Sequence, residues 1–158
     1  MKSYSTEIIS VNVVQNNVTA EVDIYIMLAD GKVPDEQYCK AVVDYLVGLE
    51  CTPADDKIYV KAPEVVRYRI TGKYYIAKSS RENEALIKES VLEAANYFVS
   101  ECHENIGNDI IPDKLIELTR IAGAKRLELT SPDFIQVSET QIAICDGIEL
   151  SYGGLEDD

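Results

Sequence analysis

Two stretches near the start of the chain, residues 7–14 and 18–28, alternate between apolar and polar side chains, which is the period of a half-buried β-strand. In the second stretch the apolar set is Val18, Ala20, Val22, Ile24, Ile26 and Leu28, and the polar set is Thr19, Glu21, Asp23 and Tyr25. Ile9, Val11 and Val13 alternate in the first. The asparagines of the intervening QNN tolerate the left-handed backbone of a tight turn. A β-hairpin is therefore predicted to open the protein.

After a turn signal at Asp30-Gly31 the period changes to that of an amphipathic helix. Pro34 suits the first helical position, and Asp35 and Glu36 complement the positive end of the helix dipole. The apolar stripe follows at helical spacing through Tyr38, Ala41, Val42, Tyr45, Leu46 and Leu49.

A polar connection then leads to KIYVKAP, in which Ile58, Val60 and Ala62 alternate and Pro63 interrupts the ladder. The next strand, EVVRYRITGKYYIA, has two distinct faces. Val66, Tyr68, Ile70, Tyr74 and Ile76 form the apolar face, and Arg67, Arg69, Thr71, Lys73 and Tyr75 form the other.

The longest helix is predicted next, with Ser79 and Glu82 in capping-box spacing and Gly107 as a stop signal. Its apolar stripe comprises Ile87, Val91, Ala94, Ala95, Phe98 and Cys102. A shorter helix should start at Pro112, followed by strands in KRLELT and QIAICDGIELSY.

These elements predict an α+β fold, with helices packed on a mainly antiparallel or mixed sheet, because strands and helices do not follow a strict βαβα rhythm. We expect two small layered units. Residues 1–63 form a ββαβ unit of hairpin, helix and strand, and residues 64–158 form a βααββ unit with an acidic C-terminal tail. One continuous sheet is the alternative.

Composition adds that 158 residues with 46% hydrophobic content can bury a core. The chain lacks the roughly 20-residue apolar run of a membrane span, and its N-terminus lacks the features of a secretory signal peptide. We therefore expect a soluble protein that is not secreted by a signal peptide. Cys39, Cys51, Cys102 and Cys145 show no CxxC spacing, which favours reduced and mostly buried thiols over disulfides or a zinc site.

Charge is distributed unevenly along the chain, whose formal net charge is −13. The segment from Lys57 to Arg81 has seven basic residues and one acid and so a charge of +6, whereas the remainder has −19. A protein of this overall sign repels phosphate backbones and anionic lipids. Neither nucleic acid nor membrane is therefore expected as the partner. Another acidic protein surface, or a second copy of this chain, fits better.

The sequence offers little catalytic chemistry. The single histidine, His103, lies between Glu101, Cys102 and Glu104 near a helix end, where neighbouring side chains diverge; we expect it to be solvated. Metalloprotease, dinucleotide, P-loop and hydrolase motifs are absent. Asp55-Asp56 and the acidic tail Glu156-Asp157-Asp158 lack EF-hand spacing and are interpreted as solvated charge. No catalytic residue, cofactor or metal ion is predicted.

The basic strands suggest a protein-binding surface. Its predicted residues are Lys57, Tyr59, Lys61, Arg67, Arg69, Lys73 and Tyr75. Arginine and tyrosine are enriched at protein interfaces, and an alternating strand can also add to the edge of a neighbour's sheet. The alternative is a solvated face whose charges block unwanted strand pairing.

The order of motifs resembles the C-terminal part of the baseplate J-like family, structural proteins of contractile phage tails and related injection machines. The resemblance rests on VTAEVDIYIMLADGKVPDEQ, TPADDKIYVKAPEVVRYRI, a long amphipathic helix, IGNDIIPDKLIELTRIAGAKRLELTSP and IELSYGG, and extends over nearly the whole chain. Ala124 follows Gly123 where the family tends to have a Gly-Val pair. Family members are usually longer, so the chain is expected to be a fragment or a short member.

The resemblance implies a non-enzymatic wedge subunit of the baseplate. Such a subunit contacts copies of itself and neighbouring wedge proteins, in a ring that joins tail tube and sheath to the fibres. It would be present in the host bacterial cytoplasm during assembly and later in the virion tail baseplate. Two competing hypotheses are a small-ligand or regulatory binding module of α+β fold and a carboxylate-dependent cell-wall hydrolase. The first predicts thermal stabilisation by a metabolite or divalent ion, and the second predicts turnover of peptidoglycan.

Overall fold

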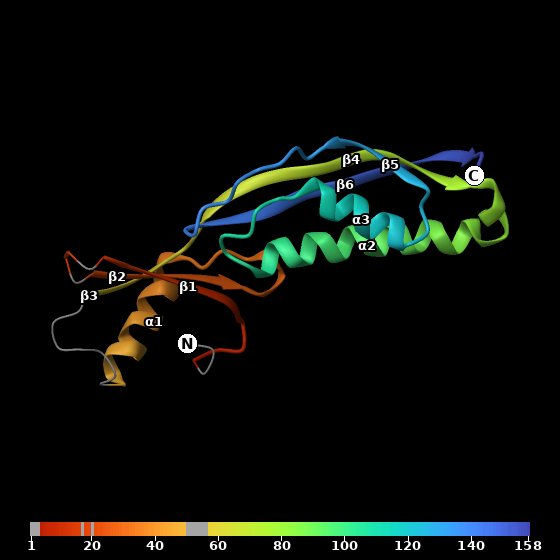
Figure 1. Cartoon of the computed structure of the whole chain (residues 1–158). Helices are drawn as coiled ribbons and strands as arrows, with labels where there is room; N and C mark the ends of the chain where they lie inside the picture. Colours follow the sequence, from red (N-terminus) through yellow and green to blue (C-terminus); the bar gives the residue numbers. More distant parts are fainter. Residues whose placement is uncertain (1–3, 17, 20, 50–56) are drawn as a thin grey trace. The chain divides into compact units, whose positions relative to one another are not determined.

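A computed structural model of the chain describes residues 4–16, 18–19, 21–49 and 57–158. Within these residues there are three α-helices and two three-stranded mixed sheets, which confirms the α+β fold class (Figure 1). Contacts divide the chain into two compact units. The first contains Met1–Val66, His103–Asn108 and Val137–Ile142; the second contains Arg67–Cys102, Asp109–Gln136 and Ala143–Asp158. The division into a ββαβ unit of residues 1–63 and a βααββ unit of residues 64–158 remains a prediction.

The sheet of the first unit has the strand order β1-β2-β3. β1 (Ile8–Asn16) and β2 (Glu21–Leu28) pair antiparallel, and β3 (Lys57–Lys61) runs parallel to β2. The predicted hairpin and the strand after the helix are thus confirmed.

The side chains of β1 that face the core are not those expected from simple alternation along the strand. The register of β1 shifts between Ile8 and Ser10, and this irregularity brings Ile8 into the core, which Val11 also contacts. Val13 is 56% exposed, so its expected place on the inner face with Val11 is wrong. Val18 is also exposed, because it belongs to the turn and not to β2.

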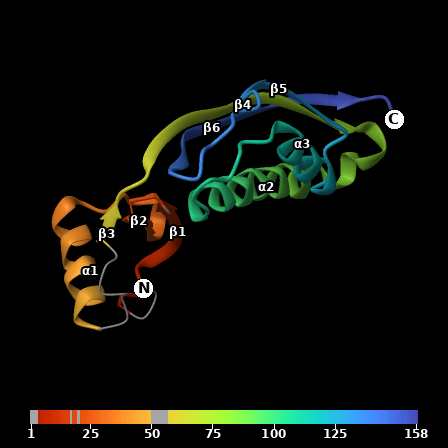
Figure 2. The ribbon, with the colours of Figure 1, turned by 60° about the vertical axis from the view of Figure 1, so that its left-hand side comes forward.

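Among the described residues of the first unit, one α-helix covers this sheet. α1 (Glu36–Gly48) follows the short 3₁₀ turn η1 (Ala29–Gly31) and lies along one side of the strands (Figure 2). The Asp35 carboxylate accepts a hydrogen bond of 2.7 Å from the Tyr38 amide, so Asp35 is the N-cap and the expected helical position of Pro34 is wrong. The core between helix and sheet contains Ile8, Ile24, Ile26, Cys39, Val42 and Val60.

The second sheet has the order β5-β4-β6, with β4 (Glu64–Ala77) between β5 (Arg126–Ser131) and β6 (Gln141–Glu156). β5 pairs antiparallel with β4. β6 runs parallel to β4, because side-chain contacts along the two strands keep a sequence offset of 79 or 80 residues. In Figure 1 the arrowheads of β4 and β6 accordingly lie at the same end.

β4 is the middle strand of the second sheet, and its burial pattern and neighbours test two predictions. Tyr68, Ile70, Tyr74 and Ile76 are buried, whereas Arg67, Arg69 and Lys73 are exposed, which confirms the predicted faces. Because β4 has neighbours on both sides, it is not an edge strand, and the expectation that it could add to another sheet is wrong.

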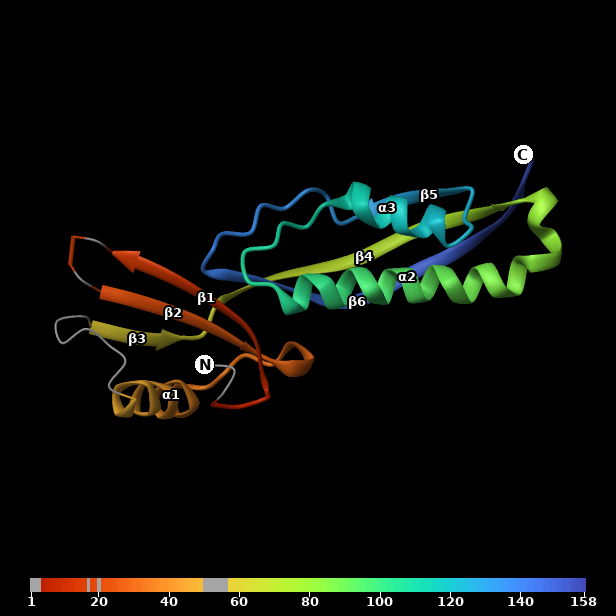
Figure 3. The ribbon, with the colours of Figure 1, turned by 60° about the horizontal axis from the view of Figure 1, so that its bottom comes forward.

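Two helices lie on the same side of the second sheet (Figure 3). α2 (Glu84–Glu104) is the longest described helix. Of the predicted stripe it buries Ile87, Val91, Ala95, Phe98 and Cys102, and Ala94 is half-buried. α3 (Pro112–Ile121) begins at the predicted proline. Together they cover the apolar face of β4 and leave its basic face on the other side.

The start of α2 differs from the predicted capping box. A 3₁₀ segment, η2 (Lys78–Asn83), precedes the helix. The amide and hydroxyl of Ser79 donate instead to the Asp158 carboxylate, at 3.2 and 2.7 Å. A distant carboxylate thus takes the place of the local partner Glu82.

The acidic tail is held against the second unit. Glu156 and Asp157 form ion pairs with Arg126 and Lys78, while Asp158 accepts the hydrogen bonds from Ser79. Glu156 is half-buried, so its interpretation as solvated charge is wrong, whereas Asp157 and Asp158 are exposed, as that interpretation predicts. Asp55-Asp56 lies outside the described residues.

The cysteines and the histidine complete the comparison. Cys39 and Cys102 are buried thiols, as predicted, and Cys145 is a half-buried thiol; Cys51 lies outside the described residues. His103 is also half-buried, and burial lowers its pKa, so the expected solvated side chain is wrong. Across the described part of the chain, every helix is too short or too polar to cross a bilayer.

Candidate functional site

The face of the second sheet that points away from α2 and α3 is lined by charged and aromatic side chains. We call it the charged face. Its members are Arg67, Arg69, Lys73 and Tyr75 on β4, Arg126 and Glu128 on β5, and Asp146, Glu149 and Glu156 on β6. Alternation places the β4 members there, since every second side chain of a strand points to the same side.

Two ion pairs join β4 to β6. Arg67 Nη1 lies 2.6 Å from Asp146 Oδ1, and Arg69 Nη1 lies 2.6 Å from Glu149 Oε1. The arginine side chains are 64% and 54% exposed. Solvent screens such pairs, so each contributes about 0–1 kcal/mol to stability. Their main effect is to set opposite charges in fixed positions on the face.

A third interaction spans all three strands. The Arg126 guanidinium lies 3.9 Å from the centre of the Tyr75 ring and reaches Glu156, with Nε 2.8 Å from Oε2. Arg126 also pairs with Glu128, whose Oε2 accepts a hydrogen bond of 3.0 Å from the Tyr75 hydroxyl. Gly153 makes room for the Tyr75 ring, since a Cβ there would lie 2.5 Å from Cε1.

These contacts shift the pKa values of the partners. The hydrogen bonds from Arg126 lower the pKa of Glu156, and together with the bond from Tyr75 they lower the pKa of Glu128. The hydrogen bond to Glu128 raises the pKa of Tyr75. The carboxyl groups of Glu128 and Glu156 are therefore ionised at neutral pH, and each carboxylate of the charged face is paired with an arginine.

We predict that Arg126→Gln reduces stability in a pH-dependent way. A carboxyl group with a lowered folded-state pKa stabilises the fold above its unfolded value, which is about 4.3 for glutamate. That contribution is lost as the pH falls through the folded value. In urea unfolding followed by circular dichroism, the variant should be less stable than wild type at pH 7, and the difference should shrink as the pH falls below about 4. A difference that stays constant with pH would assign the effect to packing of Arg126 on Tyr75.

The predicted residues of β3 belong to the first unit. Lys57, Tyr59 and Lys61 are exposed on this edge strand of the first sheet. Lys61 Nζ lies 2.7 Å from Asp23 Oδ2 and 5.5 Å from the centre of the Tyr59 ring. The hydrogen bond to Asp23 raises the pKa of Lys61. These residues form a second, smaller group beside an acidic partner.

The structure thus brings together four of the seven predicted residues, Arg67, Arg69, Lys73 and Tyr75, on the charged face, and the other three on β3. Sequence reasoning missed the acidic members and Arg126. The alternation of Arg126 and Glu128 in RLEL gave a signal for β5. The pairing of Asp146 and Glu149 with β4 depends on the parallel alignment of β6, for which the local sequence contains no signal.

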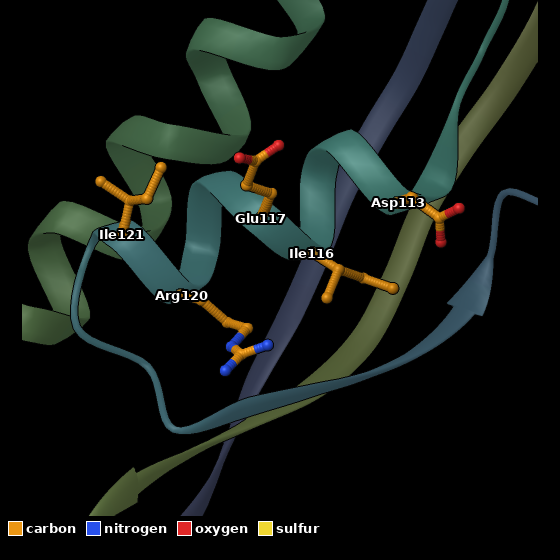
Figure 4. A pocket seen from close by; sticks show the side chains of 5 residues that line it. All are labelled: Asp113, Ile116, Glu117, Arg120 and Ile121. Carbon is orange, nitrogen blue, oxygen red and sulfur yellow. The ribbon is translucent and has the colours of Figure 1, made fainter.

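A pocket beside α3 is a weaker candidate (Figure 4). It is lined by Asp113, Ile116, Glu117, Arg120 and Ile121, all from one helix. Ligand sites usually combine an apolar cavity with polar groups that converge from several elements. Over the described ranges, no group of three or more His, Cys, Asp or Glu residues could hold a metal ion.

Comparison with known protein families places this part of the chain in a described family. A family model described as Baseplate J-like protein C-terminal domain matches residues 69–151. The match extends from β4 through α2, α3 and β5 into β6, and includes most of the charged face. No curated protein matches the chain.

Proposed function

Because the chain belongs to the family of baseplate J-like protein C-terminal domains, with a structural role in a phage tail baseplate, we propose that it is a wedge subunit whose charged face binds a neighbouring subunit. The partners in this proposal are other wedge proteins and copies of this chain. The subunit would assemble in the host cytoplasm before it becomes part of the virion tail.

The observation that carries the proposal is the charged face itself. Seven of its members lie within the matched residues 69–151: Arg69, Lys73, Tyr75, Arg126, Glu128, Asp146 and Glu149. The helices cover the opposite side of the sheet, so a partner can approach this side. Arg67 and Arg69 each form their ion pair through Nη1. A guanidinium has five N–H donors, so both arginines can also donate to carboxylates of a partner.

Fixed pairs of opposite charge suit ordered assembly. Complementary charge patterns steer encounter and fix the register of two surfaces more than they add affinity. Tyr75 and the arginines are also residue types enriched at interface centres. Lys57, Tyr59 and Lys61 on β3 are proposed as a second contact region, supported by their exposure.

We predict that reversing the charges in Arg67→Glu/Arg69→Glu weakens assembly while the protein still folds. The substitutions place glutamates beside Asp146 and Glu149, and the exposed positions limit the loss of stability to about 1–2 kcal/mol. The tagged protein would be captured from cells that express its native neighbours, and co-purified tail proteins would be quantified by mass spectrometry. Wedge- or ring-shaped particles would be counted by electron microscopy.

A charge-swap variant separates assembly from stability. Arg67→Glu combined with Asp146→Arg restores an ion pair within the sheet but inverts the pattern seen by a partner. We expect it to be as stable as wild type and to lose most of its co-purified neighbours. If the swap variant assembles as well as wild type at low salt, the charged face is a solvated surface and the proposed contact is wrong.

A further inference from the structure

Three side chains of the second unit meet where β4, α2 and β6 pass one another. Tyr68 on β4 is 5% exposed and Cys102 on α2 is 3% exposed. The Tyr68 ring contacts Phe98 edge-on, with ring centres 6.5 Å apart. The third member, Cys145 on β6, is half-buried.

The Tyr68 hydroxyl has unusual surroundings. Buried tyrosine hydroxyls normally bond to an oxygen or nitrogen atom. The Tyr68 oxygen is buried and makes no hydrogen bond of normal geometry. The polar side chains near it are the thiols of Cys102 and Cys145, and burial together with these thiols raises the pKa of Tyr68. Two thiols from different elements therefore lie near one buried oxygen, and burial and the nearby Cys145 both raise the pKa of Cys102.

The two thiols differ in access to solvent. Cys102 lies in the core, whereas the half-buried Cys145 donates a hydrogen bond of 3.3 Å from Sγ to the Gly147 carbonyl. Burial raises the pKa of both thiols, so both are protonated and slow to react at neutral pH. A reagent in solution would reach Cys145 first.

We propose that Cys102 and Cys145 are a redox pair, which a low-molecular-weight disulfide converts into a bond between α2 and β6. The Cys145 thiolate attacks one sulfur of the reagent, forms a mixed disulfide and releases one reagent thiolate, which takes up a proton. Cys145 then leaves the Gly147 carbonyl and turns toward Cys102. The Cys102 thiolate attacks Sγ of Cys145 and releases the second reagent thiolate, so two protein thiols are oxidised and one disulfide is reduced to two thiols.

The pair gives the subunit two covalent states suited to two environments. Thiols persist in a reducing cytoplasm, and disulfides persist outside the cell. For a baseplate subunit, a point that rests on the proposed function, the bond would form after release of the particle and would strengthen the second unit there. The chemistry of the pair itself is independent of the proposed partner.

The test uses the full folded chain and oxidised glutathione at pH 8.5. We expect an intact mass lower by two hydrogen atoms, and a peptide map, made without reduction, that links the peptides of Cys102 and Cys145. The urea midpoint of the product should rise and return after reduction. The rate should increase about tenfold per pH unit below the thiol pKa, in proportion to the thiolate fraction.

The variant Cys102→Ser separates the two steps. Without the second thiol, the glutathione adduct on Cys145 should accumulate. The proposal is overturned if wild type keeps that adduct and forms no link, if the link joins another pair of cysteines, or if the folded protein does not react while the urea-unfolded chain does. Because mapping is done on wild type, the result does not depend on folding of the variant.

Discussion

Truncation of Phe98 to alanine is expected to lower the free energy of unfolding by about 3–5 kcal/mol, the usual range for removal of a buried phenylalanine. Phe98 is 2% exposed on the inner face of α2 and contacts the buried ring of Tyr68 on β4. Its loss leaves a cavity between helix and sheet, which rigid neighbours fill only in part. Urea unfolding followed by circular dichroism measures the change.

The neighbouring residue provides a matched control. Tyr97 is 60% exposed on the same helix, so Tyr97→Ala should change the free energy of unfolding by only about 0.5 kcal/mol. Both substitutions exchange an aromatic residue for alanine at adjacent helical positions, so the gain in helix propensity is similar in the two variants. Equal losses would mean that α2 does not pack on the sheet through Phe98.

Alternation and helical spacing made the faces of the elements predictable. The buried and exposed sides of β4, and the stripe of α2 that contains Phe98, follow from repeats of two and 3.6 residues within a continuous segment. The same local patterns correctly located Pro112 at the start of α3. Such features depend only on neighbours along the chain, which the sequence displays directly.

Features that depend on distant segments were not predictable in this way. Ser79 bonds to Asp158, a residue 79 positions away, and so the local capping box with Glu82 does not form. The basic side of β4 suggested a positive patch, but parallel pairing with β6 sets Asp146 and Glu149 beside its arginines. Register and strand order follow from the whole set of packing contacts, and a single amino-acid sequence contains no direct record of them.

The spacing between β4 and β5 leads to the second large expected effect. Gly72 lies at the register shift of β4, and a Cβ there would lie 2.7 Å from the carbonyl oxygen of Glu128 and 3.3 Å from Cα of Leu129. Both contacts are with backbone, which cannot rotate away as a side chain can. We expect Gly72→Ala to destabilise the protein by about 1–3 kcal/mol, although alanine restricts the unfolded chain and offsets about 0.4–1 kcal/mol of strain.

Gly147 on β6 is the control, because a Cβ at that position meets no atom within 4 Å. Gly147→Ala should leave stability unchanged or raise it by up to about 1 kcal/mol, through the same effect on the unfolded chain. If Gly72→Ala proves as stable as Gly147→Ala in urea, β5 can move away from β4 at little cost.

In the expected case, the alanine displaces β5 and strains the sheet. The Tyr75 hydroxyl donates a hydrogen bond of 3.0 Å to Glu128 on β5, so the displacement also moves Glu128 away from that hydroxyl. Faster amide exchange in β5 and a pKa of Tyr75 closer to its ordinary value would then accompany the lost stability. Close packing at one glycine would thereby hold the side chains of the charged face in register.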